Sequence, residues 1–269
     1  MNDIYSAFTG NIPENYDRYL GPMFFHRCAE DLASRIADKP TKKILEIAAG
    51  TGIATRHIRD QLPRACHITA SDLNGDMLKH AEKKFSADDN VVFQVADAMA
   101  LPFDDAQFDV VTCQFGVMFC PDKVQTFREA QRVLTPGGRL LFSVWDALAH
   151  NPLPRTTNEM LDEFFDGDAP AFLHVPFSYH DQAQIRADME QAGFTDVQFT
   201  TLQGECAFDD PHHAALGMVT GSPLRIEVEQ HGEDAIDNVI EKISAGLKEK
   251  FGERDCRVPM RWTVISANL

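Results

Sequence analysis

Residues 44–56, ILEIAAGTGIATR, decide the fold of this 269-residue chain. The segment starts with apolar residues around a single glutamate, a composition typical of a strand buried in a parallel sheet. Five small residues then turn the chain into a helical pattern: Ala48, Ala49, Gly50, Thr51 and Gly52. Such a turn lets a ligand approach the backbone, and the free N–H groups of the helix start suit a carboxylate or a phosphate. The stretch therefore predicts a strand, a turn and a helix, with a ligand site at the turn.

Apolar, strand-like segments recur along the chain, separated by stretches of roughly helix length. They cover residues 43–48, 67–72, 91–97, 108–115 and 138–145. Apolar residues at helical spacing fill two of the intervals, at 77–85 and 124–134. Strands that alternate with helices form a parallel sheet covered on both faces. Two later strand-like segments, 197–203 and 261–269, complete the prediction of an α/β fold with a doubly wound, mostly parallel, seven-stranded sheet.

Further helices are expected outside the central strands. Pro22 should open one whose apolar side, from Phe25 to Ile36, packs on the edge of the sheet. The other three predicted helices cover residues 159–165, 181–193 and 235–251. We expect one domain over residues 1–269, made of four parts. These are an N-terminal lid and helix (1–39), a ligand-binding core (40–150), a helical cap on the substrate side (151–180), and C-terminal helices and strands (181–269).

Composition limits the class of protein. Apolar residues make up 44% and charged residues 25%, which fits a globular chain with one large core. The longest nearly uninterrupted apolar stretch, residues 140–145, is far shorter than the roughly 20 residues of a membrane span. The first ten residues lack the features of a secretory signal, so we expect a cytoplasmic protein. Six scattered cysteines suggest reduced, buried thiols, and no Cys/His spacing predicts a metal site.

The net charge of −16 is concentrated in the second half of the chain. Residues 1–150 carry 16 basic and 20 acidic side chains, whereas residues 151–269 carry 9 and 21. Attraction to phosphate backbones or anionic lipid requires basic patches. We therefore expect no nucleic-acid partner and no membrane insertion. The sequence leaves the oligomeric state open, and a homodimer is among the arrangements it allows.

Two acidic residues follow the second and third predicted strands. Asp72 comes 22 residues after Gly50, a spacing at which an acid can bind ribose hydroxyls. Asp97 is placed to accept a hydrogen bond from an adenine amino group, with Ala98 and Met99 beside the ring. A single acid at a strand end is often only a loop cap, but two in succession after a small-residue turn indicate an adenosine site.

The turn also distinguishes between adenosine ligands. A dinucleotide site requires a third glycine three residues after the second, and this chain has Thr55 there. Glu46 places an anionic group near the turn, where it would repel a pyrophosphate and attract an ammonium group. Both residues count against a nicotinamide-dependent oxidoreductase and favour a positively charged ligand.

Combined, these segments resemble the class I S-adenosylmethionine-dependent methyltransferases, of the group similar to the ubiquinone/menaquinone-biosynthesis enzymes. The resemblance is clear over residues 40–150. It is carried by ILEIAAGTG (44–52), SDLNGDML (71–78), ADAMALPF (96–103), FDVVTCQFGVMF (108–119) and VLTPGGRLLFSVW (133–145). It implies transfer of a methyl group from S-adenosylmethionine, with S-adenosylhomocysteine as the product.

The resemblance also implies roles for individual residues. Glu46 and the backbone of residues 48–52 would hold the methionine part of the cofactor. Asp72 with Leu73 would bind the ribose, Met77 would pack near the adenosine, and Asp97 with Ala98 would recognise adenine, while Gln114 would contribute from the fourth strand. Tyr16 and Tyr19 match an aromatic N-terminal segment that folds over the cofactor, although both rings are equally compatible with helix packing.

One residue departs from the family pattern. Ala48 replaces the usual first glycine of the turn. We expect its methyl group to be tolerated provided that the local backbone angles are ordinary.

The acceptor is less clearly indicated. His150, just beyond the fifth strand, is the candidate general base by position, although a loop histidine is usually only solvated. His174, Tyr179 and His180 are weaker candidates. The Asn-Pro-Pro-Tyr motif of amine-methylating relatives is absent, since residues 114–122 read QFGVMFCPD.

Aromatic residues of the predicted cap favour a partly apolar small molecule as the acceptor. They are Phe164, Phe165, Phe172, Phe177 and Tyr179. The same rings could instead form a satellite core. A protein side chain as the acceptor, and a cofactor-binding module without turnover, stay open as alternatives.

Overall fold

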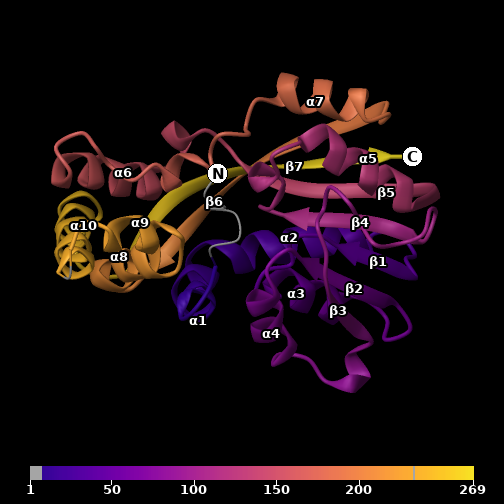
Figure 1. Cartoon of the computed structure of the whole chain (residues 1–269), viewed down its shortest axis with the longest axis horizontal. Coiled ribbons are helices and arrows are strands. Elements are labelled where there is room, and N and C mark those ends of the chain that lie inside the picture. The colour runs from indigo at the N-terminus through magenta and orange to yellow at the C-terminus, as the bar shows by residue number, and fades with distance from the viewer. Residues whose placement is uncertain (1–7, 233) are drawn as a thin grey trace.

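A seven-stranded sheet forms the centre of the computed structural model, which describes residues 8–232 and 234–269. Its strands are β1 (Lys43–Glu46), β2 (His67–Asp72), β3 (Val91–Val95), β4 (Phe108–Gln114), β5 (Leu134–Trp145), β6 (Asp196–Phe208) and β7 (Cys256–Asn268). They are ordered β3-β2-β1-β4-β5-β7-β6 (Figure 1). The first five strands pair in parallel, and β7 runs antiparallel to both of its neighbours. The predicted doubly wound, mostly parallel sheet is therefore confirmed.

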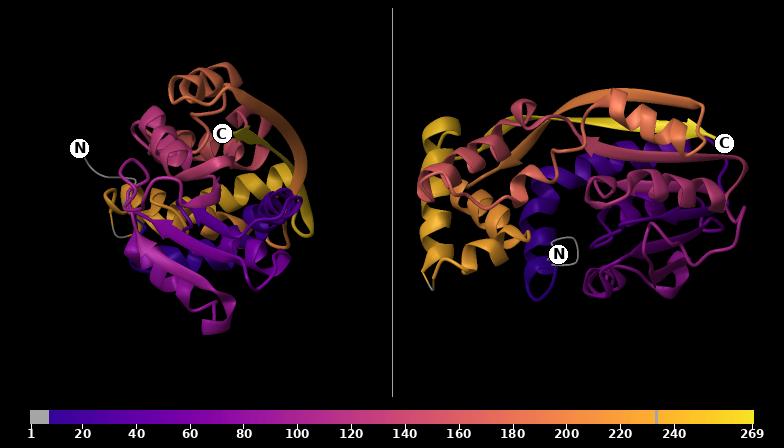
Figure 2. Two further views of the ribbon diagram at one scale, coloured as in Figure 1. Left: turned by 90° about the vertical axis from the view of Figure 1, so that its right-hand side faces the viewer. Right: turned by 45° about the horizontal axis from the view of Figure 1, so that its top comes forward.

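Helices cover the two faces of this sheet. On one face α2 (His26–Ala37) packs beside α3 (Ile53–Gln61), and on the other α5 (Lys123–Val133) packs beside α7 (Gln182–Gln191), as Figures 1 and 2 show. The residues on the inner side of α2, including Leu32 and Ile36, are completely buried. Our expectation that this helix lies on the sheet edge is wrong, because α2 contacts the inner strands β4 and β5.

The N-terminal helix also begins earlier than predicted. Before α2 come α1 (Ile12–Asn15) and η2 (Tyr16–Phe25), which winds as a π-helix and contains Pro22. Proline does not open the helix here. It has no N–H to donate and its ring crowds the carbonyl four residues earlier, and the wider π-turn accommodates both defects. The first seven residues of the predicted lid segment lie outside the described residues.

A helical lobe lies beyond one end of the sheet, reached by the long strands β6 and β7 (Figure 2). It consists of α6 (Pro152–Phe164), α8 (Pro211–Thr220), α9 (Leu224–Glu229) and α10 (Ala235–Phe251). The α10 prediction is confirmed, but the cap helix begins seven residues before the predicted Glu159 because prolines are compatible with a first helical turn. Helix α8 was not predicted, because it is buried on most sides and so lacks an amphipathic pattern. One hydrophobic cluster joins the sheet to the lobe.

Candidate functional site

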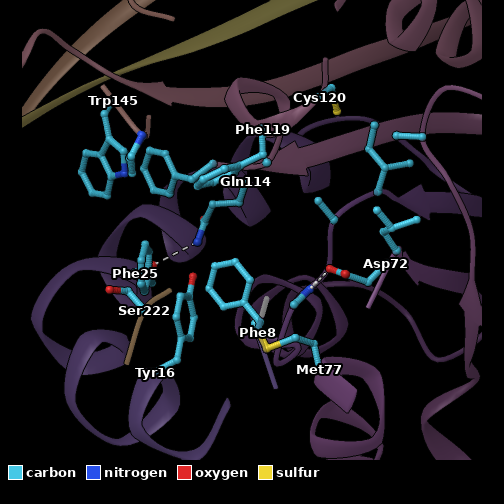
Figure 3. A pocket seen from close by; sticks show the side chains of 18 of the residues that line it. Phe8, Tyr16, Phe25, Asp72, Met77, Gln114, Phe119, Cys120, Trp145 and Ser222 are labelled. Carbon is cyan, nitrogen blue, oxygen red and sulfur yellow. Dashed lines mark hydrogen bonds between the residues drawn. The ribbon is translucent and has the colours of Figure 1, made fainter. Parts of the chain in front are cut away.

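A cavity of about 410 Å³ lies at the carboxyl ends of the parallel strands, where open α/β sheets bind their ligands. Figure 3 shows its two ends. The β1–β3 end is lined by Ile47, Ala48, Gly50, Ser71, Asp72, Leu73, Met77, Ala96, Asp97, Ala98 and Met99. The aromatic end is lined by residues of η2, of the segments after β4 and β5, of η6 (Phe172–His174) and of α8. Its rings are Tyr16, Phe24, Phe25, Phe115, Phe119, Trp145, Phe172 and Phe177, and Phe8 lies between the two ends.

The small-residue turn connects the β1–β3 end to α3. Gly50 and Gly52 have φ angles of +56° and +78°, a region that favours glycine. A Cβ atom on Gly52 would lie 3.0 Å from the Cβ atom of Ala81 in α4 (Gly75–Glu82), so packing also requires a small residue there. Two of the five predicted turn residues, Ala48 and Gly50, line the cavity. The other three, Ala49, Thr51 and Gly52, belong to the turn but do not line the cavity.

Ala48 does not have the ordinary backbone angles that we assumed for it. Its φ angle is +53°, in the left-handed region where a Cβ atom costs about 1 kcal/mol relative to glycine. Space for the methyl group comes from Gly116, where an added Cβ atom would lie 2.4 Å from that of Ala48. A strained alanine in the turn therefore faces a glycine that follows β4.

The two predicted carboxylates both line the β1–β3 end. Asp72 accepts hydrogen bonds from the backbone N–H groups of Gly50 and Asn74, each at 2.8 Å. Burial raises the pKa of Asp72 above its ordinary value, and these two hydrogen bonds oppose the shift. Asp97 accepts the N–H of Met99 at 2.8 Å. Each carboxylate keeps lone pairs for a ligand, because a carboxylate accepts about four hydrogen bonds.

Glu46 lies under the turn and does not line the cavity. Only 1% of its surface is exposed, and burial raises its pKa to about 8, an effect that the nearby Thr55 hydroxyl opposes and Asp72 reinforces. Burial therefore disfavours the charged form of this carboxyl group in the ligand-free protein, which counts against a fixed anionic group at the turn. A positive ligand charge nearby would favour its ionisation.

The aromatic end combines stacked rings with uncharged polar groups. Tyr16 stacks on Phe25 with 4.7 Å between centroids, and Phe115 stacks on Trp145 at 3.9 Å. Polar side chains here are those of Gln114, Cys120, Asn151 and Ser222. Among the described lining residues, charged side chains occur only at the other end, as Asp72 and Asp97.

Tyr19 and His150, two predicted site residues, lie outside the cavity lining. Tyr19 faces His213 of α8, with 5.9 Å between ring centroids, whereas Tyr16 lines the cavity. His150 is 46% exposed and lies 3.3 Å from the carboxylate of Asp146. From there its imidazole does not reach a substrate in the cavity, so we no longer assign it as a general base.

The weaker candidates and two cap rings are also elsewhere. His174 and His180 do not line the cavity, and the Tyr179 hydroxyl donates to Asp188 at 2.7 Å. Phe164 and Phe165 pack against each other away from the cavity. Of the predicted cap aromatics, Phe172 and Phe177 line the aromatic end.

Asp17, which the sequence analysis missed, ties η2 to the turn. Its carboxylate accepts a hydrogen bond from the Thr51 hydroxyl at 3.0 Å and forms an ion pair with Lys84. The Phe8 carbonyl similarly accepts the Asn74 side-chain amide at 3.2 Å. The N-terminal segment that supplies one wall of the cavity is thus bonded to the segments behind the other wall.

We expect Thr51→Val to lower the free energy of unfolding by about 1 to 3 kcal/mol, because it removes a hydrogen bond to a half-buried carboxylate. Urea denaturation measures this loss. The matched control is Thr41→Val, whose hydroxyl donates to the Lys39 carbonyl on an exposed surface and should change stability little. Equal losses in the two variants would contradict the role given to Asp17.

Residues 8–232 and 234–269 contain neither a metal-binding cluster nor a membrane-spanning helix. No cluster of three or more His, Cys, Asp or Glu side chains could hold a metal ion. No described helix combines the length and the apolar character needed to cross a membrane.

Comparison with known proteins identifies the family. Residues 45–142 match the model of a methyltransferase domain. The ubiquinone/menaquinone biosynthesis C-methyltransferase of Rhizobium etli is 33% identical over 207 residues, which cover 69% of this chain and 78% of that enzyme. The malonyl-[acyl-carrier protein] O-methyltransferase of Erwinia billingiae is 32% identical over 70% of this chain and 72% of the relative.

Solved structures share the fold. Haemonchus contortus phosphoethanolamine N-methyltransferase 2, in complex with phosphomonomethylethanolamine and S-adenosylhomocysteine, superposes with a TM-score of 0.63 at 18% identity, over 99% of this chain and 60% of that one. The YcgJ protein of Bacillus subtilis gives a TM-score of 0.58 at 19% identity, over 90% of this chain and 98% of that protein. The strand order, the site at the strand ends and the sequence relatives agree: the chain belongs to the class I S-adenosylmethionine-dependent methyltransferases.

Proposed function

We propose that this enzyme transfers the methyl group of S-adenosylmethionine to a small, uncharged and largely apolar acceptor. The cofactor occupies the β1–β3 end of the cavity and the acceptor occupies the aromatic end. The observation that carries this proposal is the division of one cavity into an end with two carboxylates and an end with rings and uncharged polar groups. The volume of about 410 Å³ lies within the usual range for small-molecule sites.

The residues of the β1–β3 end fit the cofactor. Gly50 presents backbone at the turn, with room for a ligand because it carries no Cβ atom. We assign Asp72 to the ribose hydroxyls, Asp97 with Ala98 to adenine, and Met77 to packing against the nucleoside. Leu73 is 49% exposed at the rim of the cavity, where a ribose would cover it. We assign the methionine part to the turn.

Catalysis here consists mainly of positioning. The cofactor supplies a methyl group already activated by the positive charge of its sulfur. The chain holds the acceptor in line with that methyl group and excludes water, and such alignment can supply about 7 to 11 kcal/mol at best. Phe25, Trp145 and Phe177 provide rigid walls for a flat apolar acceptor. Tyr16 is no base, because burial raises its pKa far above the ordinary range.

Methyl transfer to a panel of phenols, quinols, amines and thiols tests this function, with S-adenosylhomocysteine as the measured product. We expect turnover with neutral aromatic acceptors and none with phosphorylated ones, because no described cation lines the aromatic end. Cofactor binding without turnover on any acceptor would favour a binding module. Turnover on a protein substrate alone would replace the small-molecule acceptor.

We expect Asp72→Ala and Asp97→Ala each to weaken S-adenosylmethionine binding by about 1 to 3 kcal/mol, because each leaves ligand donors unpaired. Titration calorimetry measures the dissociation constants. Asp60→Ala, which removes a surface partner of Arg56, is the control and should bind normally. Unchanged affinity in both site variants would contradict the placement of the cofactor.

We also propose that the whole chain works as one domain. Support comes from the cavity, which takes lining residues from the sheet, from η2 and from α8 of the lobe. The hydrophobic cluster shared by sheet and lobe gives further support. Neither part alone would enclose the acceptor.

A further inference from the structure

Buried polar atoms without a partner gather on one side of the sheet, beneath the cavity. They are Glu46 Oε2, Thr112 Oγ1, Gln114 Oε1 and Ser143 Oγ, together with Thr55 Oγ1, which lies close enough to the Glu46 carboxyl group to interact with it. Glu46, Thr55, Thr112 and Ser143 are each at most 1% exposed. Buried polar groups are almost always hydrogen-bonded, either to protein or to ordered water. Five such atoms in neighbouring elements call for a common explanation.

The strand register places four of these residues in a continuous line. Glu46 of β1 is paired with Thr112 of β4, and Gln114 of β4 is paired with Ser143 of β5. Residues two apart on a strand share a face, so Thr112 and Gln114 point to the same side. Adjacent strands lie about 4.8 Å apart, which is a distance that a single water molecule can bridge between hydroxyl and amide groups.

This line connects Glu46 with the aromatic end of the cavity. Gln114 lines the cavity, and its amide nitrogen donates to the Phe25 carbonyl at 3.4 Å (Figure 3). Ser143 lies two residues before Trp145, on the same face of β5. At its other end the line stops at Glu46, with Thr55 of α3 beside the carboxyl group. Buried polar atoms that lack a protein partner are the groups to which ordered water binds inside proteins.

We propose that Glu46 takes up the proton released by methyl transfer, through water molecules held by Thr112, Gln114 and Ser143. This inference rests on the proposed binding of the acceptor at the aromatic end. No described side chain there is an ordinary base, since Asp, Glu, His and Lys do not line it and His150 lies outside the cavity.

The step balances in atoms and in charge. A bond forms between the acceptor atom and the methyl carbon while the carbon–sulfur bond breaks, and that electron pair stays on sulfur. The proton of the acceptor passes along the water molecules to the Glu46 carboxylate, which becomes a carboxylic acid. One positive and one negative charge thus disappear together, so that no isolated charge is left in a region of low dielectric.

The surroundings of Glu46 are consistent with this proton movement. Thr55 of α3 stabilises its charged form, whereas burial and Asp72 of β2 disfavour it, and the Cys113 thiol of β4 is also close enough to interact. The charged form of the carboxyl group is therefore disfavoured until a positive ligand charge approaches. We expect it to ionise when S-adenosylmethionine binds and to regain a proton once the sulfur is neutral.

Calorimetry in two buffers of different ionisation enthalpy tests this inference without any acceptor. At pH 7, binding of S-adenosylmethionine should release more protons than binding of S-adenosylhomocysteine, by up to about one proton per site. The difference should vanish in Glu46→Gln and persist in Glu190→Gln, an exposed glutamate on α7. Equal proton release with the two ligands in the unaltered enzyme would overturn the inference, whereas failure to bind either ligand would overturn the proposed function.

The water-holding residues are tested separately, because they do not touch the cofactor. Thr112→Val and Ser143→Ala should lower the single-turnover rate on a hydroxyl acceptor by about tenfold or more. This is less than the roughly 10²-fold to 10⁴-fold lost with a general base itself, because each variant leaves Glu46 in place. Their dissociation constants for S-adenosylmethionine should stay within about twofold of that of the unaltered enzyme. A loss of 1.4 kcal/mol in binding free energy would change them by about tenfold. Unchanged rates in both variants would overturn the route through this line.

Discussion

Replacing Glu46 with glutamine is expected to make the protein several kcal/mol more stable than the unaltered chain at pH 8, with little difference at pH 4. The reason is the buried carboxyl group, whose pKa is raised from 4.5 to about 8 by desolvation. Below pH 4.5 the group is protonated in both the folded and the unfolded protein. Between pH 4.5 and pH 8 the unfolded chain loses the proton while the folded chain keeps it, so the free energy of unfolding falls as the pH rises.

The size of this effect follows from the width of the pH window. At about 1.4 kcal/mol for each pKa unit, a pKa difference of this size corresponds to several kcal/mol, reached near pH 8 and constant above it. Glutamine does not titrate, so the free energy of unfolding of the variant does not show this fall between pH 4.5 and pH 8. Urea denaturation of both proteins at a series of pH values gives the difference, in which the contributions of all other groups cancel.

Glu129 provides a control with the opposite sign. Its carboxylate accepts hydrogen bonds from Arg132 and from the backbone of Leu101, and these lower its pKa. The charged form stabilises the fold above the unfolded pKa, and this stability is lost as the pH falls through the folded pKa. Glu129→Gln should therefore be the less stable protein at pH 8. A difference curve for Glu46→Gln that is flat between pH 4 and pH 8 would contradict the neutral buried carboxyl group.

The parts of the fold that sequence predicted are those specified locally. The five parallel strands are short apolar runs with helical patterns between them, and each pattern depends only on neighbours in the chain. Asp72 and Asp97 were placed for the same reason, since a parallel sheet brings the carboxyl ends of its strands to one edge. Gly50 and Gly52 of the turn adopt left-handed backbone angles, which glycine permits at little cost.

The aromatic end was predicted poorly because its residues are far apart in sequence. Met218 and Ser222 reach the cavity from α8 and the turn after it, which show no amphipathic pattern, and Trp145 looked like an ordinary strand end. Asp17 lies in η2, whose π-helical winding has no signal in residue spacing, and Phe8 lies before the first described helix. His150 was chosen by its position after a strand, but a short 3₁₀ turn places its ring on the surface beside Asp146.

The backbone angles of Ala48 were predicted wrongly, because the local sequence suggested ordinary values for them. The left-handed conformation there comes from the geometry of the whole turn, which overrides the preference of a single alanine. The chain tolerates it because a glycine elsewhere leaves room. That pairing of Ala48 with Gly116 across two strands becomes visible only in three dimensions.

Gly116→Ala is expected to be the most disruptive single-methyl change at the site. Its added Cβ atom would lie 2.4 Å from the Cβ atom of Ala48 and 2.6 Å from the Sγ atom of Cys113, distances at which something must move. Overpacking of a core usually costs about 1 to 3 kcal/mol, and here the rigid turn stands on one side. The φ angle of Gly116 is −108°, so the loss is steric and not a consequence of backbone strain.

A second substitution identifies the cause. Ala48→Gly alone should stabilise the protein by up to about 1 kcal/mol, because it relieves the left-handed alanine. Combined with Gly116→Ala it should recover part of the lost stability, and the remaining contact with Cys113 should prevent full recovery. A double-mutant cycle, from urea denaturation and from calorimetry with S-adenosylmethionine, measures the coupling between the two positions.

Gly75→Ala is the matched control for this cycle. Its added methyl group would meet only the Cγ2 atom of Val95, at an ordinary contact distance of 3.4 Å, in the first turn of α4. It should leave stability within about 0.5 kcal/mol of the parent, as expected for a substitution without a clash. Additive effects of the substitutions at 48 and 116 would contradict the direct contact. A coupling that restores both stability and cofactor affinity would show that the turn tolerates alanine only because Gly116 faces it.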